Sequence, residues 1–446
     1  MLKDTLKPVK IISGFDNTRF VNSDHPTGKK LDISSINGQH DVRIIIQDLN
    51  LATQCGITHL RICAPWHRIS KTSRYFDWRY IRQVLEACTW LGIKVIVDLV
   101  HHTAVPDYIN HSFADPLFVD EYLAFVRAFI NTFPSMQYDV TLINEPEPTA
   151  HLAAGGIWRP QNADYFVMIK NMAMAMSKGA MLFKQHNPAI QIFHTDPAIH
   201  YRSNDPILQN DVYYKNNVER FEVLDLLFGL INPSHLRYQH LLNHGFDSKE
   251  LAFFCENPVQ IDTLALDYYL HCEIQLGKTH TFMPALGLRA LVMQYVERYC
   301  PRFPNLNFAI GEVNVRGTVD DLTSWFYYCV KEAELLQQDI VQYRQQLEIF
   351  NVNVCPLHLG IYPLVDTFGW TNLMTHIPEN SATIHDPQGI FWIDHITMHR
   401  NHSIFSEAVM KYATGQITSD QIPYRGFDPD MHNYPGELLA HLLPHN

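Results

Sequence analysis

The chain has 446 residues and a formal net charge of −12 at pH 7. Apolar residues make up 46% of it and charged residues 18%, a balance that suits a large buried core. The acidic excess and the lack of a basic run argue against a nucleic-acid or anionic-membrane partner.

The N-terminal segment MLKDTLKPVKIISGF lacks the apolar core of a secretory signal, and no apolar stretch is long enough to span a bilayer. The eight cysteines are scattered singly, without a CxxC pair or finger-like spacing to histidine. This usage is typical of reduced thiols in a cytoplasmic protein. We expect neither a metal nor a cofactor, and the oligomeric state stays open.

A helix-like stretch, a glycine and a β-branched strand recur along the chain. Residues 41–56 (DVRIIIQDLNLATQCG) run into ITHLRICAPW, and residues 76–92 (FDWRYIRQVLEACTWLG) run into IKVIVDLVHH. In the second of these helices Asp77 can cap the start and Gly92 can end it. The strands are nearly continuous apolar runs, as parallel strands covered on both faces are.

The alternation continues to the C-terminal third of the chain. The other strand candidates, in chain order, are KIISG, DVTLINEP, AIQIFHTD, TLALDYYLH, NFAIGEVNV and CPLHLGIYPLV. Helical stretches such as DEYLAFVRAFINTF and DDLTSWFYYCVKEAELL separate them. Eight βα units favour a (β/α)8 TIM barrel of the α/β class. We predict one domain over residues 1–446, with a helical excursion over the barrel rim at about residues 203–258.

Two glutamates stand at predicted strand ends, where a barrel places its active site. The fourth strand ends in LINEPEP, with Asn144 directly before Glu145, and the seventh, FAIGEVNV, carries Glu312. Opposed strand ends can bring two carboxyls to the roughly 5–5.5 Å that retaining glycoside hydrolysis requires. Glu145 would protonate the glycosidic oxygen while Asn144 holds a sugar hydroxyl. Glu147 is a rival for Glu145, disfavoured because the Asn-Glu-Pro context singles out Glu145.

These blocks, in this order, resemble the family 1 glycoside hydrolases, with the closest likeness to compact bacterial relatives. The resemblance covers most of the chain. It implies a retaining β-glycosidase with Glu145 as acid/base and Glu312 as nucleophile, acting on a small carbohydrate or glycoside. The other matching blocks are HLRICAPWHRIS with Arg61, GIKVIVDLVHHTAVP with His101 and with His102 in place of the usual tryptophan, TLALDYYL with Tyr268 and Tyr269, and YPLVDTFGW ending in Trp370.

The resemblance also implies roles for the neighbours of the two glutamates. Arg61 would lie under Glu312 and favour its ionised form. Strand alternation allows only one of Tyr268 and Tyr269 to face inward and bond Glu312. The remaining candidate side chains would contact the sugar: His101, His102, Asn144 and Trp370. A purely structural role, in the core or in a surface ion pair, is the alternative for each.

Several positions depart from the family pattern. Gly369 stands where the strand-eight block normally has a glutamate that grips outer sugar hydroxyls, and Tyr362 replaces its first tryptophan. The segment ISGFDNTRF has no glutamine, although Asp16 is near. The residue before the nucleophile is Gly311 and the one after it is Val313, where Thr and Asn are usual. The identity of the sugar is left open.

Two further hypotheses remain. A barrel that binds carbohydrate with weak or no hydrolysis would explain the lost sugar contacts. A metal-dependent barrel hydrolase could use His101, His102 and His194. It would normally have a His-x-His on the first strand, which KIISGF lacks.

Overall fold

The computed structural model describes residues 7–21, 30–160, 162–277, 281–282, 286–349, 356–368, 385–386, 388–394 and 396–424. Eight strands form a single sheet in the order β6-β5-β4-β1-β13-β12-β9-β7. They are β1 (Lys10–Gly14), β4 (His59–Cys63), β5 (Lys94–Asp98), β6 (Asp139–Thr141), β7 (Phe193–Pro197), β9 (Thr263–Tyr268), β12 (Asn307–Val313) and β13 (His358–Ile361).

Each neighbouring pair in this sheet is parallel. A parallel bridge between Val140 and Ile192 joins the two end strands, with the Val140 N–H donating to the Gln191 carbonyl at 2.9 Å. The sheet therefore closes into a barrel of eight parallel strands, and the prediction of a (β/α)8 barrel is confirmed.

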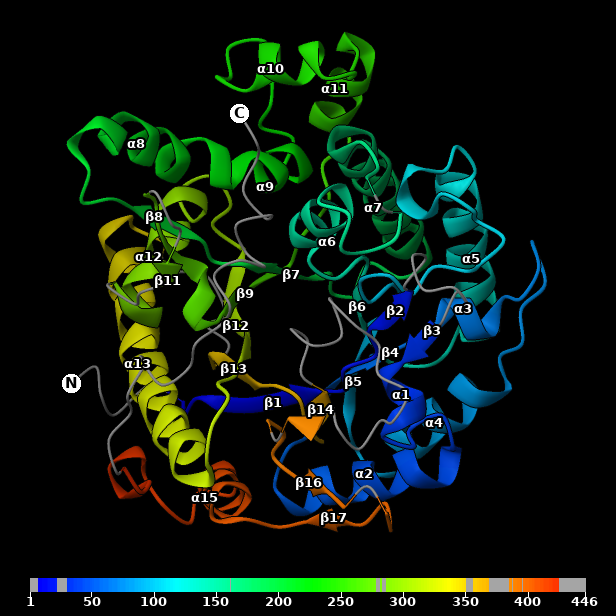
Figure 1. Ribbon diagram of the computed structural model, residues 1–446, viewed down its shortest axis with the longest axis vertical. Helices are drawn as coiled ribbons and strands as arrows, with labels where there is room; N and C mark the ends of the chain where they lie inside the picture. Colours follow the sequence, from blue (N-terminus) through cyan, green and yellow to red (C-terminus); the bar gives the residue numbers. More distant parts are fainter. Residues whose placement is uncertain are drawn as a thin grey trace.

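The long helices surround the strands (Figure 1). They are α2 (Val42–Gln54), α4 (Arg79–Trp90), α5 (Phe118–Thr132), α6 (Pro146–Ala154), α7 (Tyr165–His186), α12 (Gly287–Tyr299), α13 (Val319–Gln346) and α15 (Ile404–Ala413). The α4 helix illustrates the pattern, since Ile81, Val84, Leu85 and Cys88 are buried on one face. Gly92 follows it with a φ of +70°, a conformation that glycine adopts without strain.

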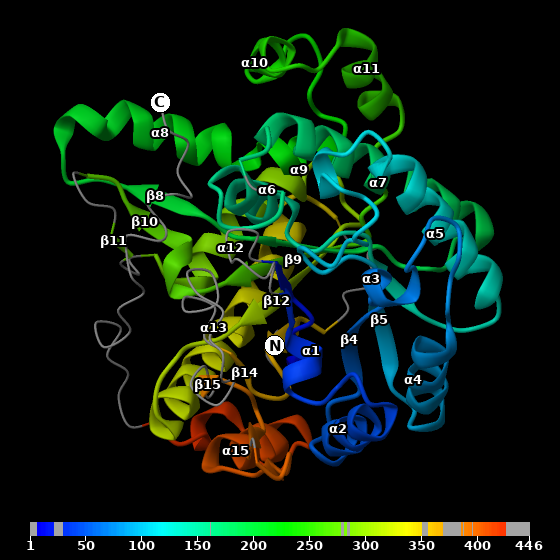
Figure 2. The ribbon, with the colours of Figure 1, turned by 45° about the vertical axis from the view of Figure 1, so that its right-hand side comes forward.

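The segment between β7 and β9 is helical, as Figures 1 and 2 show. Its helices are α8 (Gln209–Asn217), α9 (Glu222–Leu227), α10 (Tyr238–Asn243) and α11 (Ser248–Glu256). In both views α10 and α11 lie farthest from the strands. In the part of the chain that the structure describes, no helix combines the length and apolar character needed to cross a bilayer.

Short elements complete the described chain. The helices are α1 (Ile33–Ile36) and α3 (Trp66–Ile69). The strands are β2 (Arg19–Val21), β3 (Lys30–Asp32), β8 (His200–Arg202), β10 (Glu273–Gln275), β11 (Thr281–Phe282), β14 (Thr367–Phe368), β15 (His385–Asp386), β16 (Trp392–Ile393) and β17 (Arg400–Asn401).

The inside of the barrel is packed. Five buried apolar side chains, one from each of five strands, form a separate cluster: Ile12, Ile96, Phe193, Ala265 and Ala309. Polar side chains follow them toward the carboxyl ends of the strands, where a barrel of this kind carries its functional groups.

Candidate active site

Glu312 lies near the end of β12, within an irregularity in that strand. The register of β12 with both of its neighbours shifts between Ile310 and Val313. Such a bulge re-aims the side chains that follow it. Arg61 forms a buried ion pair with Glu312 Oε1, and the Tyr269 hydroxyl donates to Oε2 at 2.5 Å. Each carboxylate oxygen thus has a donor, and the two donors together stabilise the negative charge.

The two adjacent tyrosines have different surroundings. Tyr268, the last residue of β9, donates to Glu273 Oε1 at 2.9 Å and stacks on Trp325 of α13, with ring centroids 6.0 Å apart. Tyr269 lies one residue further and is the tyrosine that contacts Glu312. The alternation of side chains along a strand separates them.

Arg61 is fixed from two sides. Its Nε lies 3.8 Å from Asp98 Oδ2, and its guanidinium lies 5.1 Å from the centre of the Tyr362 ring. Asp98 Oδ2 also accepts from His101 Nδ1 at 2.8 Å. The other ring nitrogen, His101 Nε2, lies 3.4 Å from the Tyr362 hydroxyl and 3.7 Å from Asp16 Oδ1.

Glu145 directly precedes α6 and has an unusual backbone, with φ 41° and ψ 67°. A non-glycine residue in this left-handed region costs about 1–3 kcal/mol and is held there by its surroundings. His102 also has a positive φ, 47°, and its Nε2 lies 3.5 Å from Glu145 Oε2. Two residues with strained backbones, from neighbouring strand ends, are therefore in contact. Residues with strained backbones cluster at functional sites.

The side chain of Glu145 is largely buried. Glu145 is 9% exposed, and burial raises the pKa of its carboxyl above the ordinary value. Burial also lowers the pKa of His102 well below its usual range, so this imidazole is neutral at neutral pH. His102 Nδ1 lies 3.0 Å from the Thr149 hydroxyl, and the ring packs against Trp158. Glu145 is therefore placed to hold a proton.

Asn144 links three strand ends. Its Oδ1 accepts from the Thr195 hydroxyl at 2.7 Å, and its Nδ2 lies 3.1 Å from His102 Nε2. Its backbone N–H donates to the Val100 carbonyl at 2.9 Å. The side chain is fully buried, with one amide hydrogen left for a further acceptor.

The remaining predicted residues lie elsewhere or outside the described residues. Glu147 is in the first turn of α6, where its carboxylate lies 3.6 Å from His151. Trp370 and Gly369 lie outside the described residues. His194 lies on β7, 3.8 Å from Asp196. Within the described ranges, no three His, Cys, Asp or Glu side chains are grouped as metal ligands.

Three residues of this region were not singled out in the sequence. Asp98 holds Arg61 and His101, Trp158 packs on His102, and Asp267 adjoins Glu145. Asp98 and Asp267 do carry a sequence signal, since each is an acidic residue at the end of an apolar strand. Trp158 carries none, because it comes from the loop after α6.

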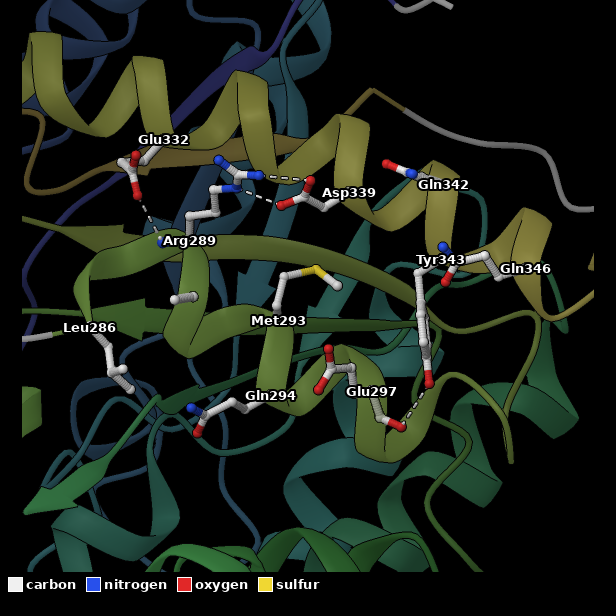
Figure 3. Close-up of a pocket in the computed structure, with 11 residues that line it drawn as sticks. Leu286, Arg289, Met293, Gln294, Glu297, Glu332, Asp339, Gln342, Tyr343 and Gln346 are labelled. Atoms are coloured by element: carbon white, nitrogen blue, oxygen red, sulfur yellow. Dashed lines mark hydrogen bonds and ion pairs between the residues drawn. The ribbon is translucent and has the colours of Figure 1, made fainter.

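A separate groove lies on the outer surface. It has a volume of about 720 Å³ and lies between α12 and α13 (Figure 3). The Arg289–Asp339 ion pair bridges the two helices, with Arg289 Nη2 donating to Asp339 Oδ1 at 2.9 Å. The side chains that line it come from these outer helices and from Leu286, not from the carboxyl ends of the barrel strands, so the groove is distinct from the site around Glu312.

Solved structures with a similar fold include β-glucosidases from Thermotoga maritima. One is a Thermotoga maritima β-glucosidase in complex with deoxynojirimycin, with a TM-score of 0.66 and 14% identity, covering 91% of this chain and 97% of that one. Its complex with azafagomine has a TM-score of 0.67 at 14% identity, covering 92% and 97%. The structure described as a family 1 β-glucosidase from Thermotoga maritima has a TM-score of 0.67 at 14% identity, covering 91% and 96%.

No protein-family model and no curated protein sequence matches the chain. The resemblance seen in the sequence blocks is thus confirmed as a likeness of fold, over nearly the whole length of the family 1 β-glucosidases.

Proposed function

We propose that this protein is a retaining β-glycosidase with Glu312 as nucleophile and Glu145 as acid/base. The observation that carries the proposal is the contrast between the two carboxyls. Arg61 and Tyr269 each offer a donor to Glu312, whereas Glu145 lies beside a neutral histidine in a buried place that favours its protonated form. One group suits attack and the other suits proton delivery.

The two half-reactions follow from these states. The Glu312 carboxylate bonds the anomeric carbon while Glu145 gives its proton to the departing aglycone oxygen. Water then attacks the glycosyl ester, and Glu145 takes the water proton as the Glu312–sugar bond breaks. Both residues return to their starting states, and the sugar keeps its anomeric configuration.

Four neighbours would bind the sugar. His101 Nε2 and the remaining amide hydrogen of Asn144 suit hydroxyl groups, and His102 lies between them. Trp370 would provide an apolar face for the pyranose ring. We further propose that the substrate is a small glycoside, that the chain forms a single domain and that the protein is cytoplasmic. Seven free cysteines among the described residues are compatible with that location.

The second candidate is a barrel that binds carbohydrate with little or no turnover. The observation in its favour is Gly369, which removes an acceptor for outer sugar hydroxyls.

Release of nitrophenol from a panel of aryl β- and α-glycosides tests the proposal. The panel should include glucoside, galactoside, fucoside and 6-phosphorylated glycosides. We expect turnover of at least one β-glycoside that Glu312→Ala abolishes. Saturable binding of the same glycosides, by calorimetry, without turnover in the wild type would favour the second candidate.

A further inference from the structure

Asp267 is a buried carboxyl inside the barrel that the proposed chemistry does not use. It follows Leu266 on β9, on the same strand face as Ala265, which belongs to the interior apolar cluster. The side chain has no exposed surface. A carboxylate in such a place needs donors or a proton, because desolvation of the charge is costly.

No backbone N–H, amide, hydroxyl or basic side chain among the described residues donates to either oxygen of Asp267. The side chain that acts on it at hydrogen-bonding range is that of Glu145, itself a carboxyl. Two ionised carboxylates offer only acceptors, so a bond between them requires a proton on one. Six further groups of this region act on the pair electrostatically or adjoin it: Arg61, Asp98, His101, His102, Asp196 and Cys272.

The residue before Glu312 makes room for this carboxyl. A Cβ atom on Gly311 would lie 2.3 Å from Asp267 Oδ1 and 3.2 Å from the Ala265 Cβ. Real Cβ atoms do not approach this closely, so a larger residue at this position requires Asp267 to move. The glycine at position 311, which departs from the family pattern, is therefore needed for Asp267 to keep its observed position.

We infer that Asp267 and Glu145 hold one proton between them, and that Asp267 is the positioning residue for the proton that Glu145 delivers. The inference rests on the proposed function for its catalytic meaning. In the first half-reaction the pair gives its proton to the departing aglycone oxygen, breaking one carboxyl O–H bond and forming one alcohol O–H bond. In the second the pair takes one proton from the attacking water, so the count is restored.

The titration behaviour of the two groups supports this sharing. Burial, and next the charge of Glu145, raise the pKa of Asp267 well above its usual range. The pKa of Glu145 is raised as well, because the effect of burial exceeds that of the hydrogen-bonding contact with Asp267, which acts to lower it. When two such groups interact, protons leave the pair in two steps that belong to neither residue alone.

A double-mutant cycle read by infrared spectroscopy tests the inference without substrate. The readout is the intensity of the protonated-carboxyl band at neutral pH in wild type, Asp267→Asn, Glu145→Gln and the double variant. A shared proton predicts that each single variant loses one carboxyl's intensity and that the double variant loses no more. In each single variant an amide donor faces the remaining carboxyl, which then ionises.

Two outcomes would overturn the inference. Full additivity, with the double variant losing two carboxyls, means that each group holds its own proton. Loss in one single variant and none in the other means that one group alone is protonated. Asp139→Asn is the comparison variant, because this carboxyl is partly buried and also has a raised pKa, but it begins β6 at the opposite end of the barrel. The change in band intensity caused by Asp139→Asn should add fully to the change caused by Asp267→Asn.

The activity assay separates this inference from the proposed function. If the protein hydrolyses glycosides and the proton is shared, Asp267→Asn moves the basic limb of the kcat/KM profile down by at least about one pH unit, the interaction expected for such a pair. If Asp267→Asn is slower but its basic limb lies at the same pH as in the wild type, the shared proton is contradicted and the proposed function is not. No turnover in wild type contradicts the function, while the infrared cycle still decides the sharing. If Asp267→Asn fails to fold, the intensity of the protonated-carboxyl band in Glu145→Gln still tests the inference.

Discussion

At the scale of single residues, the site depends on which groups carry charge and which carry protons. Glu312 receives one donor on each oxygen, from Arg61 and Tyr269. Glu145 instead contacts the neutral imidazole of His102. The difference is therefore built into the side chains that each glutamate touches.

The adjacent tyrosines give a matched test of the contact to Glu312. Tyr269→Phe removes a hydrogen bond to a charged group, worth about 1.5–3 kcal/mol, so kcat/KM should fall about 10- to 100-fold. Tyr268→Phe removes the same hydroxyl from a neighbouring position whose partner is Glu273. The control should lower the melting temperature with little effect on kcat/KM. Equal losses of activity in both would contradict the assignment of Tyr269.

The role of Glu145 predicts a dependence on the leaving group. Glu145→Ala should slow glycosides of poorly acidic aglycones far more than dinitrophenyl glycosides, because only the former require a proton as they depart. The measurement is kcat for a series of aryl glycosides of graded phenol pKa. If log kcat depends on the phenol pKa with the same slope in Glu145→Ala as in the wild type, Glu145 is not the acid.

The pH profile follows from the direction of the Glu145 pKa. Burial raises this pKa above the ordinary 4.5, so the acid stays protonated to higher pH than a solvated glutamate. Activity should therefore fall on the basic side as pH rises through the raised value, and the limb should lie above pH 4.5. The Glu145→Gln variant, assayed with an activated glycoside, should lack this limb. A limb that persists in it belongs to another group.

At the scale of secondary structure, strands and helices were predictable and their irregularities were not. KIISG and NFAIGEVNV read as strands because each contains a short apolar run. Asp77 does accept from the Arg79 N–H, although Trp78 takes the N-cap position. The register shift before Val313 has no sequence signature apart from Gly311. That shift, with the turn at Tyr269, sets which side chains face Glu312.

A buried ion pair fastens the C-terminal segment to the barrel helices. Arg400 of β17 donates to both oxygens of Asp48 on α2, at 2.7 and 2.9 Å. Arg400→Met would leave the Asp48 charge buried with Gln39 as its remaining side-chain donor, which costs about 3–5 kcal/mol. The urea midpoint should fall accordingly. Arg79→Met, which breaks the exposed pair with Asp77, should leave the midpoint nearly unchanged.

At the scale of the whole molecule, the barrel was predictable because eight βα units leave few alternatives. Its closure through Val140 and Ile192, and the contact of Asp267 with Glu145, join residues far apart in the sequence. No local pattern encodes such contacts. The fold is shared with β-glucosidases at 14% identity, so the fold alone does not fix the substrate.

The sugar preference is expected to follow from Gly369. A glutamate there would accept charge-assisted hydrogen bonds from sugar hydroxyls, each worth about 1.5–3 kcal/mol. Plain aryl β-glucosides and β-galactosides should therefore be poor substrates beside glycosides altered at their outer hydroxyls. Specificity constants for wild type and Gly369→Glu decide this. A wild-type value of about 10⁴ M⁻¹s⁻¹ or more for plain glucoside would contradict it.

The central claim is that Glu312 forms a covalent bond to the sugar. Chemical rescue of Glu312→Gly by azide, with a dinitrophenyl β-glycoside that the wild type cleaves, tests it most directly. We predict that the variant is inactive alone, that azide restores release of the phenol, and that NMR identifies the product as the α-glycosyl azide. A variant that stays inactive with azide while Glu147→Gly is rescued, or a product of β configuration, would contradict the assignment.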